Sequence, residues 1–315
     1  MPPLNQHAVD ATQKIFSRIL VPTDFSEVSR RAFFFALALA ARFDLQVYLA
    51  HVITITNPPA SPQANASHTS EAERQSAEER LHKFTSALPD GTPSFTCLLE
   101  EGQLWDAADR LVHKYGIDLI VAGTRGVGAR PQPALGSGAE QIFRHATCPV
   151  LTIGPSTAPE ELAQIQFRSV LFVTDFGPDA EHAALFAIAV ARKYGARFAA
   201  LHVVEDSGAP SRLELDHLTQ IHIQHMRHEL ATVDRTFSPS QFCVRFGNAA
   251  DEILKKAQEI TADLIVMGSK TRSSSGWAGH VPLSTAYNVV AKAVCPVLTV
   301  RAGRPHSHYV SSPSD

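Results

Sequence analysis

The sequence is poor in cysteine and has no large excess of charge of either sign. Its four cysteines are spread over 315 residues without metal-ligand spacing, so we expect neither a disulfide framework nor a zinc site. We interpret them as small apolar residues buried in a core, at positions Cys97, Cys148, Cys243 and Cys295. The 28 basic and 31 acidic residues give a formal net charge of −3, which argues against nucleic acid or a membrane surface as a partner.

Long hydrophobic runs are also absent. The most apolar stretch, residues 32–41, lies between Arg31 and Arg42 and is far shorter than the roughly 20 residues that a bilayer-spanning helix needs. The polar residues 1–14 lack the charged start, apolar centre and cleavage site of a signal peptide. We therefore expect a cytoplasmic protein.

The chain does contain an internal repeat. Three segments of the first half recur in the second half with similar spacing. They are Ile-Leu-Val-Pro-Thr-Asp-Phe at 19–25 against Val-Leu-Phe-Val-Thr-Asp-Phe at 170–176, His-Val at 51–52 against 202–203, and Cys-Pro-Val-Leu-Thr at 148–152 against 295–299. We therefore predict two homologous domains, at 1–157 and 165–303, and a disordered tail at 304–315.

Each half alternates short β-branched apolar runs with longer helical patterns, which is typical of a doubly wound α/β domain. In the first half we expect strands at 19–21, 47–52, 95–99, 119–122 and 150–153 and helices near 27–42, 71–88, 104–114 and 139–144. In the second half we expect strands at 170–173, 198–203, 242–246, 264–267 and 297–300. The pattern predicts two tandem Rossmann-like domains, each with a five-stranded parallel sheet and helices on both faces.

Glycines follow the fourth strand of the first half, at the sheet edge where open parallel sheets bind ligands. Gly123 and Gly126 are followed, after nine further residues, by Gly136-Ser137-Gly138 at the start of a helix. Glycine lets a backbone approach phosphate, and the amides of a helix start attract an anion. Ser137 can cap that helix or donate its hydroxyl to a phosphate. The alternative is that these glycines only form turns.

The glycine spacing and its flanking segments resemble the universal stress protein family. The matching segments are Leu-Val-Pro-Thr-Asp-Phe-Ser at 20–26, Asp-Leu-Ile-Val-Ala-Gly at 118–123 and Arg-His-Ala-Thr-Cys-Pro-Val-Leu at 144–151. Because the resemblance covers both halves, the chain is identified as a tandem, UspA-like member. It implies an ATP-binding stress-response protein and not an enzyme, with slow hydrolysis left open. The alternative is a nucleotide-independent protein-interaction module of the same family.

The resemblance also implies where a nucleotide lies. Adenine and ribose are expected against the turn after the first strand and the end of the second strand, and the phosphates along the glycine segment. The residues carried over are Pro22, Asp24, Val52, Ala122, Gly123, Gly126, Gly136, Ser137 and Gly138. Arg125 is added as a phosphate contact, the alternative being an ordinary solvated loop arginine. Mg²⁺ or Mn²⁺ would accompany the phosphates. For Asp24 the alternative is that it only caps the helix that follows it.

The second half departs from the motif. Thr271 replaces the second glycine, Val281-Pro282 stands where Gly-Ser belongs, and Val173 replaces the proline of the first turn. We therefore expect nucleotide in the first half only. We interpret four histidines of the second half as a solvated helix face, at positions 217, 222, 225 and 228.

Assembly follows from the resemblance as well. In the family the last strand of one domain pairs antiparallel with that of another, which covers an apolar edge. We therefore expect residues 150–153 to pair with 297–300 and join the halves as a pseudo-dimer within the chain, and we leave a homodimer of the whole chain open.

Overall fold

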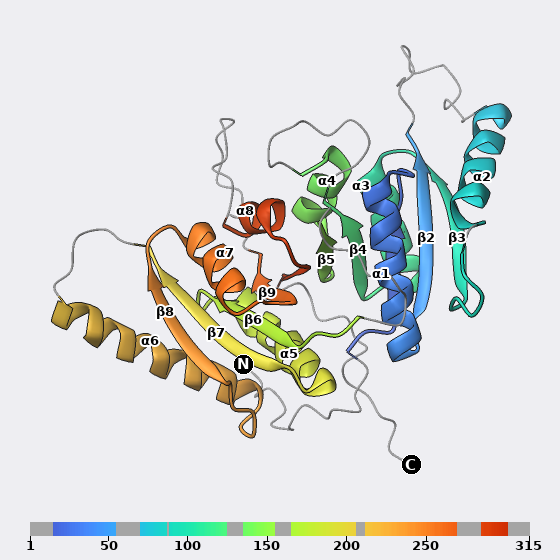
Figure 1. Ribbon diagram of the computed structural model, residues 1–315. Helices are drawn as coiled ribbons and strands as arrows, with labels where there is room; N and C mark the ends of the chain where they lie inside the picture. Colours follow the sequence, from blue (N-terminus) through green and yellow to red (C-terminus); the bar gives the residue numbers. More distant parts are fainter. Residues whose placement is uncertain are drawn as a thin grey trace, which may run out of the picture.

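The computed structural model describes residues 15–54, 70–86, 88–124, 135–154, 165–205, 212–269 and 285–301. All ten expected strands are present in these segments, and they form one sheet of order β3-β2-β1-β4-β5-β10-β9-β6-β7-β8 (Figure 1). Each half contributes five parallel strands. The two sets run in opposite directions because β5 and β10 pair antiparallel.

The elements follow the α/β order expected for both halves. Those of the first half are β1 (Arg18–Pro22), α1 (Glu27–Phe43), β2 (Gln46–Ile53), α2 (Glu71–Thr85), β3 (Phe95–Glu101), α3 (Leu104–Tyr115), β4 (Leu119–Gly123), α4 (Ser137–His145) and β5 (Val150–Ile153). Those of the second half are β6 (Ser169–Thr174), α5 (Pro178–Tyr194), β7 (Arg197–Val204), α6 (Arg212–Val233), β8 (Gln241–Phe246), α7 (Ala249–Glu259), β9 (Leu264–Gly268), α8 (Thr285–Lys292) and β10 (Val297–Val300).

Two helix ends of the first half differ from the expected ones by more than one residue. The helix α2 ends at Thr85 and not at residue 88, because Pro89 disfavours helical geometry in the residue before it. The helix α4 begins at Ser137, two residues before the expected start. Its extended N-cap is Gly136, so a segment that resembles a loop in sequence is already helical.

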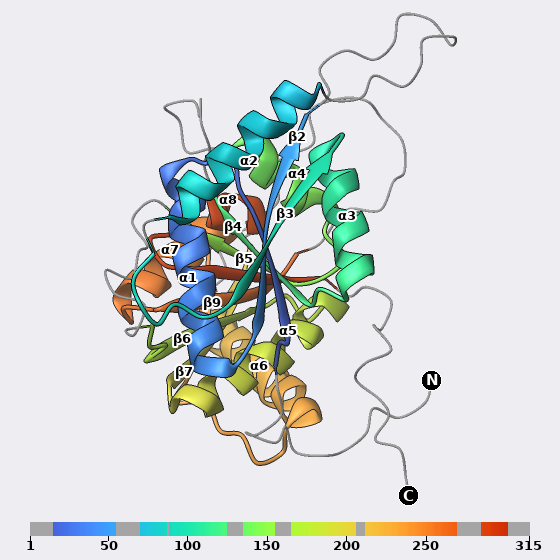
Figure 2. The same cartoon turned by 90° about the vertical axis from the view of Figure 1, so that its right-hand side faces the viewer.

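Helices cover both faces of the sheet, as expected. In Figure 2, α1 and α2 lie on one side of the first-half strands and α3 lies on the other. The α3 side has its own apolar core, which includes Leu20, Leu111 and Ile142. On the α1 side one core contains residues of both halves, among them Phe33 and Phe172. The two halves therefore fold around a shared interior on that side.

A half-buried carboxylate joins two strands in each half. Asp118, just before β4, accepts hydrogen bonds from the backbone amides of Ser17 (2.7 Å) and Arg18 (2.9 Å) at the start of β1. Asp263 makes the equivalent bonds at the start of β6. The Asp-Leu-Ile-Val motif that recurs in the sequence thus has a structural role, since its aspartate fixes the register of neighbouring strands.

The pairing of β5 with β10 is the seam between the halves. Val297 lies opposite Thr152, and Thr299 lies opposite Val150, so the two strands that meet are those expected from the sequence. The Thr152 hydroxyl donates to the Val297 carbonyl (3.1 Å), and the Thr299 hydroxyl donates to the Val150 carbonyl (3.3 Å). Both threonine side chains are buried, so side-chain hydrogen bonds reinforce the backbone ladder from both sides.

Aromatic rings extend the seam over the α1 face. Phe16 stacks on Phe186 with ring centroids 5.2 Å apart, and Phe43 meets Tyr194 edge-on at 5.4 Å. Each of these pairs has one member in each half. Aromatic pairs of this geometry contribute about 0.5–1.5 kcal/mol each beyond the area that they bury, so the halves are held together by more than the strand ladder.

The cysteine interpretation is wrong for one residue. Cys148, Cys243 and Cys295 are buried, but Cys97, on the edge strand β3, is exposed. Cys243 lies on the other edge strand, β8, yet it is buried because it belongs to a core with Ile253 and Ala257 of α7. Within the described segments no helix is long and apolar enough to cross a membrane.

A fragment of residues 1–157 tests the seam. We expect it to dimerise or aggregate, because without the second half it exposes the β5 edge and the aromatic side chains that pack against α5. Light scattering coupled to size-exclusion chromatography gives its mass. A stable monomer at high concentration would contradict this description of the seam.

Candidate functional site

Three strand ends meet at the expected site in the first half. β1 lies between β2 and β4 in the sheet, and Pro22, the last residue of β1, pairs with Ala50 of β2. The chain leaves β1 toward the α1 face and leaves β4 toward the face that α3 and α4 share. In open α/β sheets the crevice at such a divergence is the usual ligand site. The structure thus brings Pro22, Val52 and Gly123 to one edge of the sheet.

The two ends of the glycine segment are held together. The Gly136 amide donates to the Thr124 carbonyl at 2.9 Å, which fixes the start of α4 beside the end of β4. No side chain caps α4, whereas Ser26, Ser70 and Asn248 cap α1, α2 and α7. The expectation that Ser137 caps the helix is therefore wrong, because Ser137 is its first helical residue. Arg125 and Gly126 lie outside the described residues.

Gly123 has a packing role of its own. A Cβ at this position would lie 2.8 Å from Val28 Cγ1 and 2.9 Å from the Val28 carbonyl oxygen, because α1 crosses β4 there. A Cβ on Gly268 would likewise lie 2.8 Å from the Asp179 Cβ of α5. Since both halves keep this glycine, Gly123 taken alone does not indicate a ligand.

Asp24 lies in the turn that follows β1. Its carboxylate accepts a hydrogen bond from the Ser26 amide at 3.0 Å, and Ser26, not Asp24, is the N-cap of α1. The suggestion that Asp24 caps this helix is therefore wrong. Asp175 makes the same bond to the Gly177 amide in the second half, so a turn explains why the aspartate recurs. The Asp24 side chain is exposed at the sheet edge.

The same turn holds a phenylalanine in an unusual conformation. Phe25 has φ +65°, and its counterpart Phe176 has φ +59°. The left-handed region is costly for a bulky residue, and such strain is found mainly where the surroundings enforce it. Here the ring of Phe25 packs 4.3 Å from the ring of His51 at the end of β2. Nothing in the sequence distinguished these phenylalanines as turn residues.

His51 is a half-buried residue near the end of β2. Its Nδ1 lies 2.8 Å from the Thr23 carbonyl, so this nitrogen is the donor. Burial lowers the pKa of His51 below its ordinary value, which keeps the ring neutral at pH 7. Arg80 of α2 places its guanidinium 4.3 Å from the centroid of Phe25. Sequence reasoning missed Arg80, which brings positive charge next to the turn.

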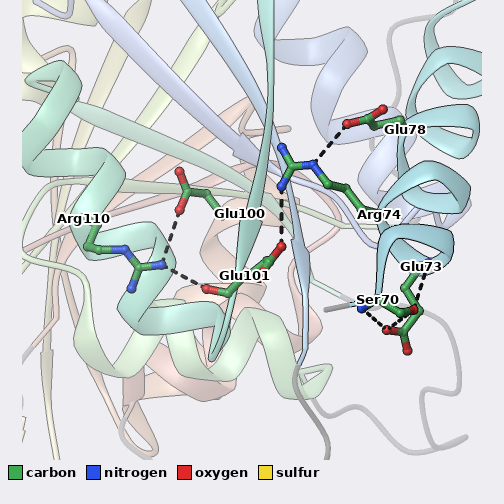
Figure 3. Close-up of polar contacts among 7 residues, drawn as sticks. All are labelled: Ser70, Glu73, Arg74, Glu78, Glu100, Glu101 and Arg110. Atoms are coloured by element: carbon green, nitrogen blue, oxygen red, sulfur yellow. Dashed lines mark hydrogen bonds and ion pairs between the residues drawn. The ribbon is translucent and has the colours of Figure 1, made fainter. Parts of the chain in front are cut away.

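Carboxylates beside Val52 are paired with arginines (Figure 3). Glu100 of β3 lies opposite Val52, and its carboxylate is 3.3 Å from Arg110 Nη2. Glu101 lies 3.4 Å from Arg74 Nη1. The arginines offset negative charge that would otherwise repel a phosphate near this edge.

The corresponding edge of the second half has a different charge. The Thr174 hydroxyl donates to Glu229 Oε1 at 2.8 Å. Glu229 and Arg80 occupy matching places, since each directly precedes the buried leucine of its helix, Leu230 or Leu81. Burial raises the pKa of Glu229 to about 7, although the Thr174 hydrogen bond opposes the shift. The second half therefore has a titrating carboxyl where the first has an arginine.

Three aromatic rings pack together at the same edge of the second half. Phe176 lies 4.4 Å from His202, and His202 lies 4.5 Å from His222 between ring centroids. The expectation of a solvated histidine face is therefore wrong for His222 but holds for His217, His225 and His228, which are exposed. Across the described segments, no three histidine, cysteine or acidic residues are grouped to hold a metal. Thr271 and Val281-Pro282 lie outside those segments.

Known proteins with similar sequences support the repeat. The sequence profile of the universal stress protein family matches residues 16–154 and again 166–301. Over 142 residues the chain is 29% identical to the universal stress protein MJ0531 of Methanocaldococcus jannaschii, a match that covers 45% of this chain and 84% of that protein. It is 27% identical over 290 residues to a universal stress protein of Mycolicibacterium smegmatis, which covers 90% of this chain and 96% of the relative.

Solved structures share the two-domain architecture. A universal stress protein from Archaeoglobus fulgidus superimposes with a TM-score of 0.63 at 20% identity, over 94% of this chain and 98% of that one. A putative universal stress protein from Pseudomonas aeruginosa gives 0.60 at 17% identity, over 93% and 95%. At such identities the likeness concerns the fold alone, but the family profile covers most of the sequence. The chain therefore belongs to the universal stress protein family, and each half contains one stretch that matches the family.

Proposed function

We propose that the chain is a stress-response regulatory protein that binds one ATP, with Mg²⁺ or Mn²⁺, in its first half. The observation that carries the proposal is the hydrogen bond between Gly136 and Thr124. It places the start of α4, which no side chain caps, at the carboxyl edge of the sheet. The amides of such a helix start and the positive end of its dipole favour a phosphate.

The surroundings of this helix start suit the rest of a nucleotide. Pro22 and Val52 are half-buried and offer apolar surface to a base, and the exposed Asp24 carboxylate can accept hydrogen bonds from ribose hydroxyls. Ala122 is buried, so we expect it to contribute through its backbone. Ser137 is exposed at the first position of α4, where its hydroxyl can donate to a phosphate oxygen.

The metal ion would be held mainly by the phosphates. Among the residues carried over from the family, Asp24 is the one with a carboxylate side chain. A divalent ion that keeps several waters and binds phosphate oxygens needs few protein ligands. We propose that this site binds the nucleotide without rapid turnover, and a turnover assay measures any slow hydrolysis.

Titration calorimetry with MgATP tests the proposal. We expect a stoichiometry near one per chain, because Arg80 and the start of α4 favour an anion in the first half, whereas Glu229 disfavours one in the second. Two equal sites would contradict the assignment of the second half as degenerate. No binding of any adenine nucleotide would instead favour a nucleotide-independent interaction module.

The variant Gly136→Val tests the position of the phosphates. Gly136 has φ −63° and ψ 156°, a conformation that valine adopts easily, so we expect the fold to persist. The branched side chain would occupy space at the helix start, and ATP binding should be lost. If the variant has an unchanged melting temperature and wild-type affinity, the phosphates bind elsewhere.

The variant Glu229→Gln tests the charge of the second half. The folded protein holds a proton on Glu229 up to about pH 7, above its ordinary pKa of 4.5, so this residue makes stability fall as pH rises through that window. Glutamine can still accept the Thr174 hydrogen bond and does not ionise. At pH 8 we expect the variant to be more stable by on the order of 2 kcal/mol, with a smaller difference at pH 5.

Chemical denaturation at pH 5 and pH 8 measures this effect. Asp216→Asn, an exposed change on the same helix, is the matched control and should not alter the pH dependence. Burial lowers the pKa of His202 and of His222, but both histidines are present in wild type and variant, so the comparison isolates Glu229. Parallel pH profiles of wild type and variant would contradict the assignment.

A further inference from the structure

The helix that begins at the candidate phosphate site contacts side chains of the other half at both of its ends. In Figure 1, α4 of the first half and α8 of the second lie next to each other beside the seam. Tyr287, in the first turn of α8, reaches the residue before the start of α4. Arg301, directly after β10, reaches the end of α4.

Tyr287 fixes the N-terminal end of α4. The Leu135 amide donates to the Tyr287 hydroxyl at 3.3 Å, and Leu135 is buried. The next residue is Gly136, whose amide bonds to β4. The Tyr287 ring also meets Phe143 edge-on at 6.0 Å. One side chain of the second half thus holds the backbone where the first half would present its amides to a phosphate.

Arg301 fixes the C-terminal end of α4. Its Nη1 donates to the carbonyls of Arg144 (2.9 Å) and Ala146 (3.2 Å), and its Nη2 donates to the Phe143 carbonyl (2.8 Å). The last carbonyls of a helix have no partners within the helix and carry its negative end. A single guanidinium satisfies three of them and places a positive charge at that end.

Among the residues that the structure describes, the first half has no counterparts of these two side chains. With Cys148 aligned to Cys295, the residue that corresponds to Arg301 is Gly154, which has no side chain. The residue that corresponds to Tyr287 is Glu140, and its carboxylate lies 2.7 Å from Arg144 of its own helix. Tyr287 and Arg301 of the second half therefore hold α4, whereas their counterparts in the first half do not hold α8 in this way. The half whose helix is held is the one that keeps the glycine spacing.

We propose that the second half acts as a positioning and regulatory domain for the ligand site of the first half, through Tyr287 and Arg301. This inference rests on the proposed function, since the ligand at the start of α4 is taken to be a nucleotide phosphate. A phosphate at the N-terminus of α4 and the Arg301 guanidinium at its C-terminus would both stabilise this helix in the position that the structure shows. Binding in the first half and docking of α4 on the second half should therefore strengthen each other, because coupling is reciprocal.

The test uses the full-length chain and three variants. Arg301→Gln removes the guanidinium, Arg301→Lys keeps the charge, and Tyr287→Phe keeps the ring but not the hydroxyl. Arg245→Gln, which removes an exposed ion pair of the second half, is the matched control. None of these residues lies in the proposed nucleotide site.

Amide hydrogen exchange without nucleotide is the first readout. We expect residues 136–146 to exchange about tenfold faster in Arg301→Gln, a factor that corresponds to 1.4 kcal/mol, and at an intermediate rate in Arg301→Lys. The amide of Leu135 should lose protection in Tyr287→Phe. Exchange in α1 and α3 should stay at wild-type rates. Unchanged rates there would show that the fold persists. Wild-type exchange across α4 in both Arg301→Gln and Tyr287→Phe would overturn the proposal.

Affinity for MgATP is the second readout. We expect the dissociation constant to rise about fivefold to tenfold in Arg301→Gln and in Tyr287→Phe, with partial recovery in Arg301→Lys and no change in Arg245→Gln. If wild type binds and both variants bind equally well, the second half does not regulate the site. If wild type binds no ATP, the proposed function fails, and the exchange rates alone decide whether the second half positions α4.

Discussion

The antiparallel pairing of β5 with β10 is the constraint on which the rest of the structure depends. It turns two five-stranded sheets into one and covers an apolar strand edge in each half. It brings α1 and α5 together over a common core, and it brings α8 beside α4. Because the two strand sets run in opposite directions, their carboxyl ends lie at opposite edges of the sheet. The two halves therefore cannot share one ligand edge, and each has to be judged by its own side chains.

The halves keep the same backbone frame and differ in the side chains on it. Both halves have a phenylalanine with positive φ in the turn after the first strand and a histidine whose ring is hydrogen-bonded to a backbone carbonyl at the end of that strand. Around this frame, however, the first half has Arg80 where the second has Glu229, and the second has Arg301 where the first has Gly154. The first difference concerns which half attracts an anion. The second concerns which half supports the other. The two halves thus share a backbone frame but differ in the charged side chains around it.

Most of the fold could be predicted from the sequence because it is encoded locally. Short apolar runs, many of them rich in β-branched residues, mark the strands, and the repeat of Cys-Pro-Val-Leu-Thr marks the strands that meet at the seam. The first residue of α4 was placed two positions late, at 139 and not at Ser137, because a glycine N-cap carries no side-chain signal. Cys97 was misjudged because residue type alone does not show which side chains of an edge strand are covered: Cys243, on the other edge strand, is buried.

The site was less predictable because its supporting contacts are non-local. Leu135 and Tyr287 are 152 residues apart, and no spacing rule connects them. Arg80 resembles any other charged residue of a polar helix, and its place over Phe25 emerges only from packing. Conversely, Gly123 stood out in the sequence, yet the close crossing of α1 over β4 accounts for it without a ligand.

Amide hydrogen exchange of the wild-type chain with and without MgATP tests the central claim most directly, because it locates the ligand and its effects in one measurement. The account predicts slower exchange at residues 22–26, 122–124 and 136–146 and at the start of α8, with no change at residues 173–177 and 264–269. Equal protection of both halves, or protection confined to the second half, would contradict it.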